Sequence, residues 1–103
     1  MTASMRQREN ETMIPVKILR KSDVIANTGI SNTVLYGLIA DGLFPPVISL
    51  GGSRSVGFIE YEVNTVMVAR STGYDNDKIK GLVTRLIEQR QEVLNELLLQ
   101  LCA

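Results

Sequence analysis

Hydrogen-bonding side chains gather over one short stretch of the chain, at Ser31, Asn32, Thr33 and Tyr36, with Gly37 beside them. An asparagine amide can make two hydrogen bonds to adenine, and a threonine methyl group can contact the methyl group of thymine. A tyrosine hydroxyl can donate a hydrogen bond to a phosphate oxygen. Residues of these types within two helical turns are suited to contacting a nucleic-acid duplex.

Each of these residues also has a simpler interpretation. Ser31 could act only as an N-cap, whose hydroxyl accepts a hydrogen bond from an unpaired helix amide. Asn32 and Thr33 could form an ordinary exposed helix start, and the ring of Tyr36 could be half-buried against a neighbouring hairpin. Gly37 costs a helix up to about 1 kcal/mol relative to alanine. That cost indicates either close approach by a backbone or partner, or the loss of a larger ancestral side chain.

Two short helices joined by a tight turn must hold this group of residues, and they span residues 22–42. Gly29 can end the first helix in the left-handed conformation without a steric cost, and Ile30 can fill the space between the helices. The inward-facing apolar residues are predicted to be Val24, Ile25, Ala26, Leu35, Leu38 and Ile39. Spacings of three and four in the second helix are typical of one buried helical face.

A β-hairpin is predicted directly after this helix pair. Pro45 and Pro46 exclude a helix, residues 47–50 and 55–59 have strand character, and a Gly-Gly turn joins them. A further short strand is predicted over residues 16–19. Helix, turn, helix and hairpin in this order indicate a winged helix-turn-helix, in which the second helix can enter a major groove.

Basic residues near these elements are candidates for contacting DNA. The hairpin tip carries Arg54, flanked by Ser53 and Ser55, and Arg54 is the strongest single candidate for a groove or backbone contact. Arg20 and Lys21, with Lys17 nearby, flank the first helix and could hold phosphates. Alternatively, Arg54 is a solvated turn residue and the others form an ordinary basic surface.

The predicted DNA-binding unit has an unusually low positive charge. Between residues 21 and 60, two basic residues (Lys21 and Arg54) stand against three acidic ones (Asp23, Asp41 and Glu60), a net charge of −1. DNA affinity depends largely on neutralising phosphates. This balance favours a second hypothesis, a protein-interaction module that kept the fold and lost DNA binding.

Two further helices are predicted, at residues 60–71 and at about 77–101. The inward stripe of the first contains Val63, Val66 and Met67. The second carries an apolar stripe wider than a two-stranded coiled-coil seam, too long for the small preceding core to cover. We expect its far part to pair with another subunit, the alternative being that it folds back on its own domain. The residues assigned to self-association are Leu86, Ile87, Val93, Leu94, Leu97, Leu98 and Leu101.

Composition limits the remaining classes of protein. The chain has 103 residues, 11 basic and 11 acidic residues, one cysteine and no histidine. These numbers favour one domain and argue against an internal disulfide, a Cys/His metal site and His-based catalysis. We therefore expect no enzyme, no cofactor and no small-molecule ligand. No apolar run has the length of a membrane span or the form of a signal peptide, so a cytoplasmic, nucleoid-associated protein is expected.

The predicted organisation has three parts. Residues 1–15 form a mobile N-terminal arm, residues 16–72 the winged domain, and residues 76–102 an amphipathic helix for self-association. The predicted fold class is mainly α with a small β-hairpin wing and a long C-terminal helix.

The segment over about residues 17–70 resembles the AlpA family of phage and prophage regulators. The residues that carry this resemblance, in order, are Thr28-Gly29-Ile30-Ser31, Leu35-Tyr36, Gly42-Leu43-Phe44-Pro45, Leu50-Gly51-Gly52 and Val56-Gly57. The family has a winged helix-turn-helix similar to those of MerR regulators and small phage excisionases. Asn32 and Gly37 stand where the family usually has basic residues.

The resemblance implies a transcriptional regulator that binds double-stranded DNA and acts on mobile-element genes. Helix 31–41 would lie in the major groove and the wing tip 51–55 on the adjacent groove or backbone. Some relatives are excisionase-type recombination directionality factors, which is a variant of the same hypothesis. A two-fold homodimer would bind a palindromic or repeated site.

Overall fold

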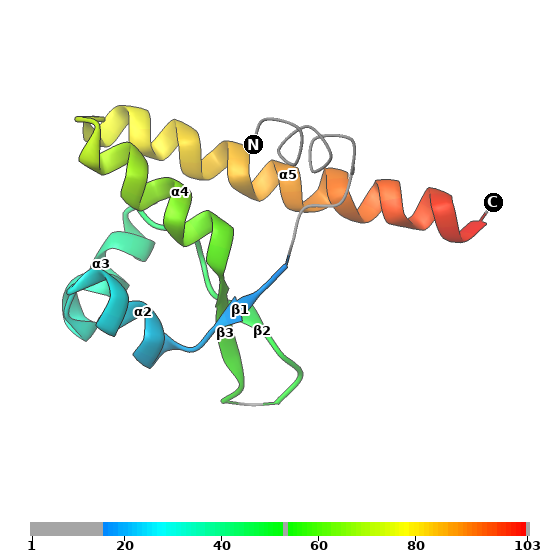
Figure 1. Ribbon diagram of the computed structural model, residues 1–103, viewed down its shortest axis with the longest axis horizontal. Helices are drawn as coiled ribbons and strands as arrows, with labels where there is room; N and C mark the ends of the chain where they lie inside the picture. The colour runs from blue at the N-terminus through cyan, green and yellow to red at the C-terminus, as the bar shows by residue number, and fades with distance from the viewer. Residues whose placement is uncertain (1–15, 53, 103) are drawn as a thin grey trace, which may run out of the picture.

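A computed structural model describes residues 16–52 and 54–102. Within these residues four helices and three short strands follow one another along the chain (Figure 1). They are β1 (Ile18–Leu19), α2 (Lys21–Thr28), α3 (Asn32–Ala40), β2 (Ile48–Ser49), β3 (Val56–Ile59), α4 (Glu60–Ser71) and α5 (Asn76–Cys102). The mainly α fold with a hairpin wing and a long last helix is therefore confirmed. The predicted arm, residues 1–15, lies outside the described residues.

The turn between α2 and α3 forms as its residue types predict. Gly29 has a φ of 73° and its N–H donates to the carbonyl of Ile25 at 2.9 Å. The Thr28 hydroxyl donates to the carbonyl of Val24 at 2.7 Å and accepts from the N–H of Ile30 at 3.2 Å. Left-handed backbone at this point requires glycine, so this turn fixes the angle at which α3 leaves α2.

The sheet is antiparallel with the strand order β1-β3-β2. The predicted hairpin is confirmed by β2 and β3, which pair Ile48 with Gly57 and Ser49 with Val56. The short strand β1 pairs with the other edge of β3, where Leu19 lies opposite Phe58. A Cβ at Gly57 would collide with the side chain of Ile18. Glycine at this position therefore lets β1 lie against the centre of the sheet.

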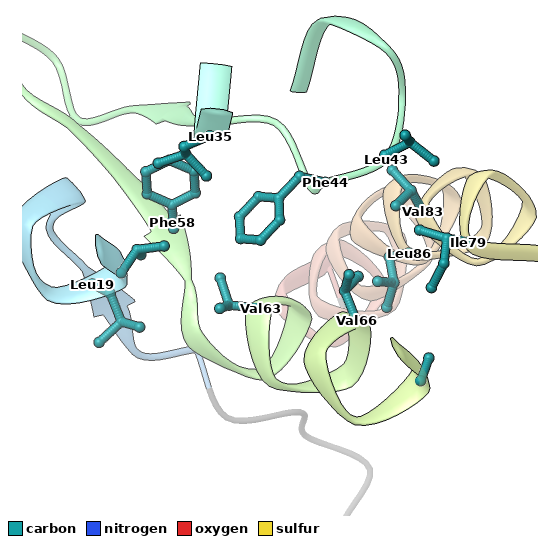
Figure 2. Packing of buried hydrophobic residues seen from close by; sticks show 12 residues of the cluster. Leu19, Leu35, Leu43, Phe44, Phe58, Val63, Val66, Ile79, Val83 and Leu86 are labelled. Carbon is teal, nitrogen blue, oxygen red and sulfur yellow. The ribbon is translucent and has the colours of Figure 1, made fainter. Parts of the chain in front are cut away.

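The hydrophobic core joins the four helices with β1 and β3 (Figure 2). Phe44, from the segment before β2, meets Phe58 of β3 edge to face, with ring centroids 5.9 Å apart. Leu35 of α3 is fully buried beside them. Val63 and Val66 enter from α4, as predicted. Ala26 is exposed, so its assignment to the inward face of α2 was wrong, and α2 buries Val24 with Ile25 half-buried.

The long helix α5 has two different halves. Its first half lies along α4 and buries Ile79, Val83 and Leu86 in the shared core (Figures 1 and 2). The assignment of Leu86 to self-association was therefore wrong, because its side chain is only 5% exposed within its own chain. The second half extends beyond the other described elements towards the C-terminus (Figure 1). Among the described residues, the large apolar side chains that α5 leaves exposed lie from Ile87 onward.

A buried ion pair joins α4 to α5 at the midpoint of α5. Glu62 is fully buried, and both of its carboxylate oxygens accept from the guanidinium of Arg90, at 2.8 Å from Nε and 2.6 Å from Nη2. The same Nη2 donates to the carbonyl of Pro46 at 3.0 Å. The hydrogen bonds that the guanidinium donates to Glu62 raise the pKa of Arg90 above its usual range. This network ties both helices to the segment that leads into the wing.

Candidate nucleic-acid interface

One face of α3 is open and polar because its opposite face is buried. Leu35 is fully buried, and Leu38 and Ile39 are half-buried against the core. The residues of this region that were predicted to contact DNA are all exposed: Ser31, Asn32, Thr33, Tyr36 and Gly37. The hydroxyl of Ser31 accepts from the N–H of Val34 at 3.3 Å. Ser31 therefore caps α3, and the next residues form an accessible first turn.

Tyr36 connects α3 to the start of α2. Its side chain is 43% exposed, and the ammonium nitrogen of Lys21 lies 5.2 Å from the centre of its ring. A cation over an aromatic face is an attractive arrangement. This contact holds Lys21 beside the open polar face of α3. It brings a positive charge to a helix that has no charged residue of its own.

A cleft of about 520 Å³ lies between the start of α2 and the wing. Its lining residues are Arg20, Lys21, Ser22, Leu50, Arg54, Ser55 and Val56. Three of the predicted contact residues, Arg20, Lys21 and Arg54, are thus brought together although 33 positions separate the second from the third. Basic side chains around a groove of this kind are suited to a phosphate backbone. Because Lys21 also contacts Tyr36, the cleft and the α3 face form one continuous surface.

The other sequence-based candidates have different positions. Ser55 lines the cleft with Arg54, whereas Ser53 lies outside the described residues. The ammonium of Lys17 lies 3.6 Å from a carboxylate oxygen of Glu60, at the surface. Lys17 thus has an acidic neighbour, in contrast to the basic residues grouped around the cleft.

Gly37 leaves the exposed face of α3 open. A Cβ at Gly37 would meet no heavy atom within 4 Å. No close approach by the described part of the chain therefore explains this glycine, and the remaining interpretations are a partner that comes close or a lost side chain.

Sequence reasoning missed several residues of this surface. Val34 is 52% exposed on α3, and Ser22, Leu50 and Val56 line the cleft. The sequence placed Leu50 and Val56 only in the two strands of the hairpin. In the structure Leu50 directly follows β2 and Val56 begins β3, and their positions at the cleft depend on packing that residue type does not indicate.

None of the helices within residues 16–52 and 54–102 combines the length and apolar character that a membrane crossing requires.

Two comparisons with known proteins match about half of the chain each. Residues 17–74 match the family described as prophage CP4-57 regulatory protein (AlpA). The chain is 39% identical over 57 residues to "Uncharacterized protein ORF88" of Enterobacteria phage P4. That alignment covers 55% of this chain and 64% of the phage protein. No solved structure matches significantly. The matched region contains the helix pair, the wing and α4, and it ends before α5.

Proposed function

The chain belongs to the AlpA family of prophage regulatory proteins, and from this premise we propose that it binds double-stranded DNA at specific sites and regulates transcription of mobile-element genes. The observation that supports this most strongly is the continuous surface formed by the α3 face, Lys21 and the cleft. In this proposal α3 enters the major groove and Asn32 and Thr33 contact base edges. Arg20, Lys21 and Arg54 hold the phosphates of the flanking backbone.

The phosphate contacts can be tested by the salt dependence of binding. A labelled fragment from upstream of the gene is titrated at several salt concentrations. Each lost phosphate contact lowers the slope of log K against log salt by about 0.9. Lys21→Gln and Arg54→Gln should each lower the slope by about this amount and weaken specific and non-specific binding alike. Lys80→Gln is the matched control, because it removes the same charge from an exposed position on α5, outside the cleft.

Base recognition needs a separate variant. Asn32→Ala should weaken binding to the specific fragment by about 1–3 kcal/mol, the usual value of a bidentate base contact. Binding to unrelated DNA should stay unchanged. The proposed function would be contradicted if the wild-type protein bound neither the specific fragment nor unrelated DNA measurably. Binding whose log K does not depend on log salt would also contradict it.

An interaction module that kept the fold without binding DNA is the second candidate, supported by the net charge of −1 between residues 21 and 60. It predicts a co-purifying protein partner and no DNA affinity. Deleting residues after 92 tests whether the end of α5 holds that partner. Deletion from Tyr74 would be uninformative, because it removes Ile79 and Val83 from the core.

An excisionase role is a variant of DNA binding. It requires a target site beside an integrase gene and an attachment site, and genomic position and footprinting would separate it from transcriptional control.

The proposal also includes self-association through α5 from Ile87 onward. The residues that support it are exposed or half-buried and apolar: Ile87, Val93, Leu94, Leu97, Leu98 and Leu101. Large exposed apolar patches usually mark an interface. A two-fold dimer would bind two half-sites, so the bound fragment should contain a palindromic or repeated sequence.

A further inference from the structure

From Ile87 to the end of α5, apolar residues recur every seven positions. In this repeat the a positions are Ile87, Leu94 and Leu101. The d positions are Arg90 and Leu97. This is the a and d spacing of a coiled coil. The repeat is interrupted only by Arg90, whose guanidinium is bound to Glu62 and Pro46.

The charged residues of α5 do not prevent this stripe from pairing with the same stripe of a second copy. The acidic residues Glu88, Glu92 and Glu96 fall at the b, f and c positions, which face away from a coiled-coil seam. The positions that border the seam are uncharged: Gln91, Val93, Leu98 and Gln100. Two copies can therefore approach along the stripe without placing like charges beside each other.

A small cleft lies at the start of the stripe. It has a volume of about 110 Å³ and is lined by Val16, Ile59, Tyr61, Arg90 and Val93. Because the guanidinium of Arg90 is already hydrogen-bonded to Glu62 and Pro46, the cleft offers mainly apolar surface. Its size and lining fit one aliphatic side chain.

We propose that two copies of the chain pair their α5 helices antiparallel and that Leu101 of each copy fills this cleft of the other. In an antiparallel pair with two-fold symmetry, an a position of one helix faces a d position of the second, and the exchange is reciprocal. Placing Leu94 against Leu97 of the second copy makes the central layer. One heptad step along each helix then puts Leu101 against Arg90 of the second copy, at the cleft.

A second copy of this chain is the proposed partner because the side chain of Leu101 matches the cleft. The chain supplies an 82% exposed Leu101 and, eleven residues earlier, the cleft that fits it. A parallel pair would place Leu101 against its own equivalent, and the cleft would stay empty. This inference rests on the self-association part of the proposed function and is independent of DNA binding.

The oligomeric state tests the register of the pair. Wild-type protein should sediment as a dimer. Leu101→Glu should raise the dimer Kd by about 30-fold or more, because it would place a carboxylate in the apolar cleft of the second copy. Leu99→Glu is the matched control, because Leu99 is 73% exposed but lies at the outward f position, and it should change the Kd by less than about 3-fold. Monomeric wild-type protein, or equal effects of the two substitutions, would overturn the proposal.

Substitutions in the cleft test the direction of the pair. Val16 lies outside α5 and lines the cleft, so Val16→Glu should weaken an antiparallel dimer and leave a parallel one intact. Circular dichroism checks that each exposed-site variant keeps its helix content. An undiminished dimer in Val16→Glu protein would overturn the antiparallel arrangement.

Disulfide trapping gives a positive signal for the same direction. In a Cys102→Ser background, Val16→Cys combined with Leu101→Cys should form disulfide-linked dimers under a glutathione buffer. Leu101→Cys alone should not, because the two equivalent residues lie about 16 Å apart along an antiparallel pair, too far for a disulfide. Self-linking of the single variant, or no linking of the double variant, refutes the arrangement. DNA binding is measured separately, so a failure there leaves this result unaffected.

Discussion

Replacing Arg90 with methionine should destabilise the fold more than most single substitutions. The guanidinium gives Glu62 both of its strong hydrogen bonds and gives one to the carbonyl of Pro46. Methionine keeps much of the side-chain length and removes all three. The carboxylate of Glu62 would then lie fully buried without a donor.

The expected cost follows from the burial of the two partners. Removing one member of a buried ion pair usually costs about 3–5 kcal/mol, because the remaining charge is uncompensated. The Arg90 side chain is 24% exposed, so water can reach part of the gap, and about 3 kcal/mol is the expected value. Total domain stability is only about 5–15 kcal/mol. Arg90→Met should therefore remove a large fraction of it.

Substituting the other partner of the ion pair, Glu62, should cost less stability. In Glu62→Gln the charge left behind belongs to Arg90, which is partly exposed and can be hydrated, so about 1–3 kcal/mol is expected. Replacing both residues, with Glu62→Leu and Arg90→Met, should give a stability within about 1 kcal/mol of wild type or above it.

Urea unfolding followed by circular dichroism measures these differences. A Leu101→Glu background avoids linking unfolding to association, which would make stability depend on protein concentration. The difference between the double variant and the sum of the single variants gives the coupling energy. A cost below about 1 kcal/mol for Arg90→Met would refute the reasoning. So would a double variant as unstable as the sum of the two single variants.

Four more substitutions give separate tests. Gly57→Ala should cost about 1–3 kcal/mol in urea unfolding, because the added methyl group collides with β1. Ser31→Ala should cost about 0.5–2 kcal/mol through loss of the cap and, if Ser31 only caps, leave the DNA affinity of the folded protein unchanged. Gly37→Ala should stabilise α3 by up to about 1 kcal/mol, since the site is open. Burial, and then the charge of Glu62, raise the pKa of Tyr61 above 10.0. The contribution of the neutral Tyr61 hydroxyl to the free energy of unfolding is therefore complete below pH 10. It is lost as pH rises through the folded-state pKa of Tyr61. Tyr61→Phe should reduce that alkaline loss in unfolding curves measured from pH 8 to 12.

Local residue chemistry made most of the fold predictable from the sequence. Gly29 at the turn, Ser31 as a cap and the two prolines before β2 each restrict the backbone within a few residues, and the structure has them as predicted. The end of α4 at Ser71 and the span of α5 follow from helix periodicity in the same way. The winged arrangement then follows from the order of the elements.

Contacts between distant residues could not be predicted. No sequence pattern linked Arg90 to Glu62. Their pairing across 28 positions depends on how α4 packs against α5. Leu86 was misassigned for the same reason, since periodicity identifies an apolar face without indicating which molecule covers it. At the candidate interface, residue type suggested Arg20, Lys21 and Arg54 separately, but only the packed fold brings them to one cleft.

If α3 contacts DNA as proposed, its open face would allow target preference to change independently of folding. Asn32, Thr33 and Gly37 are exposed, and the core depends on Leu35 from the opposite face. Under the proposed function, substitutions at these three positions would alter which sequence is preferred while the packed interior stays intact. A regulator of this kind would then acquire a new binding site by single changes, without first gaining the extra stability that mutations in a protein core usually require.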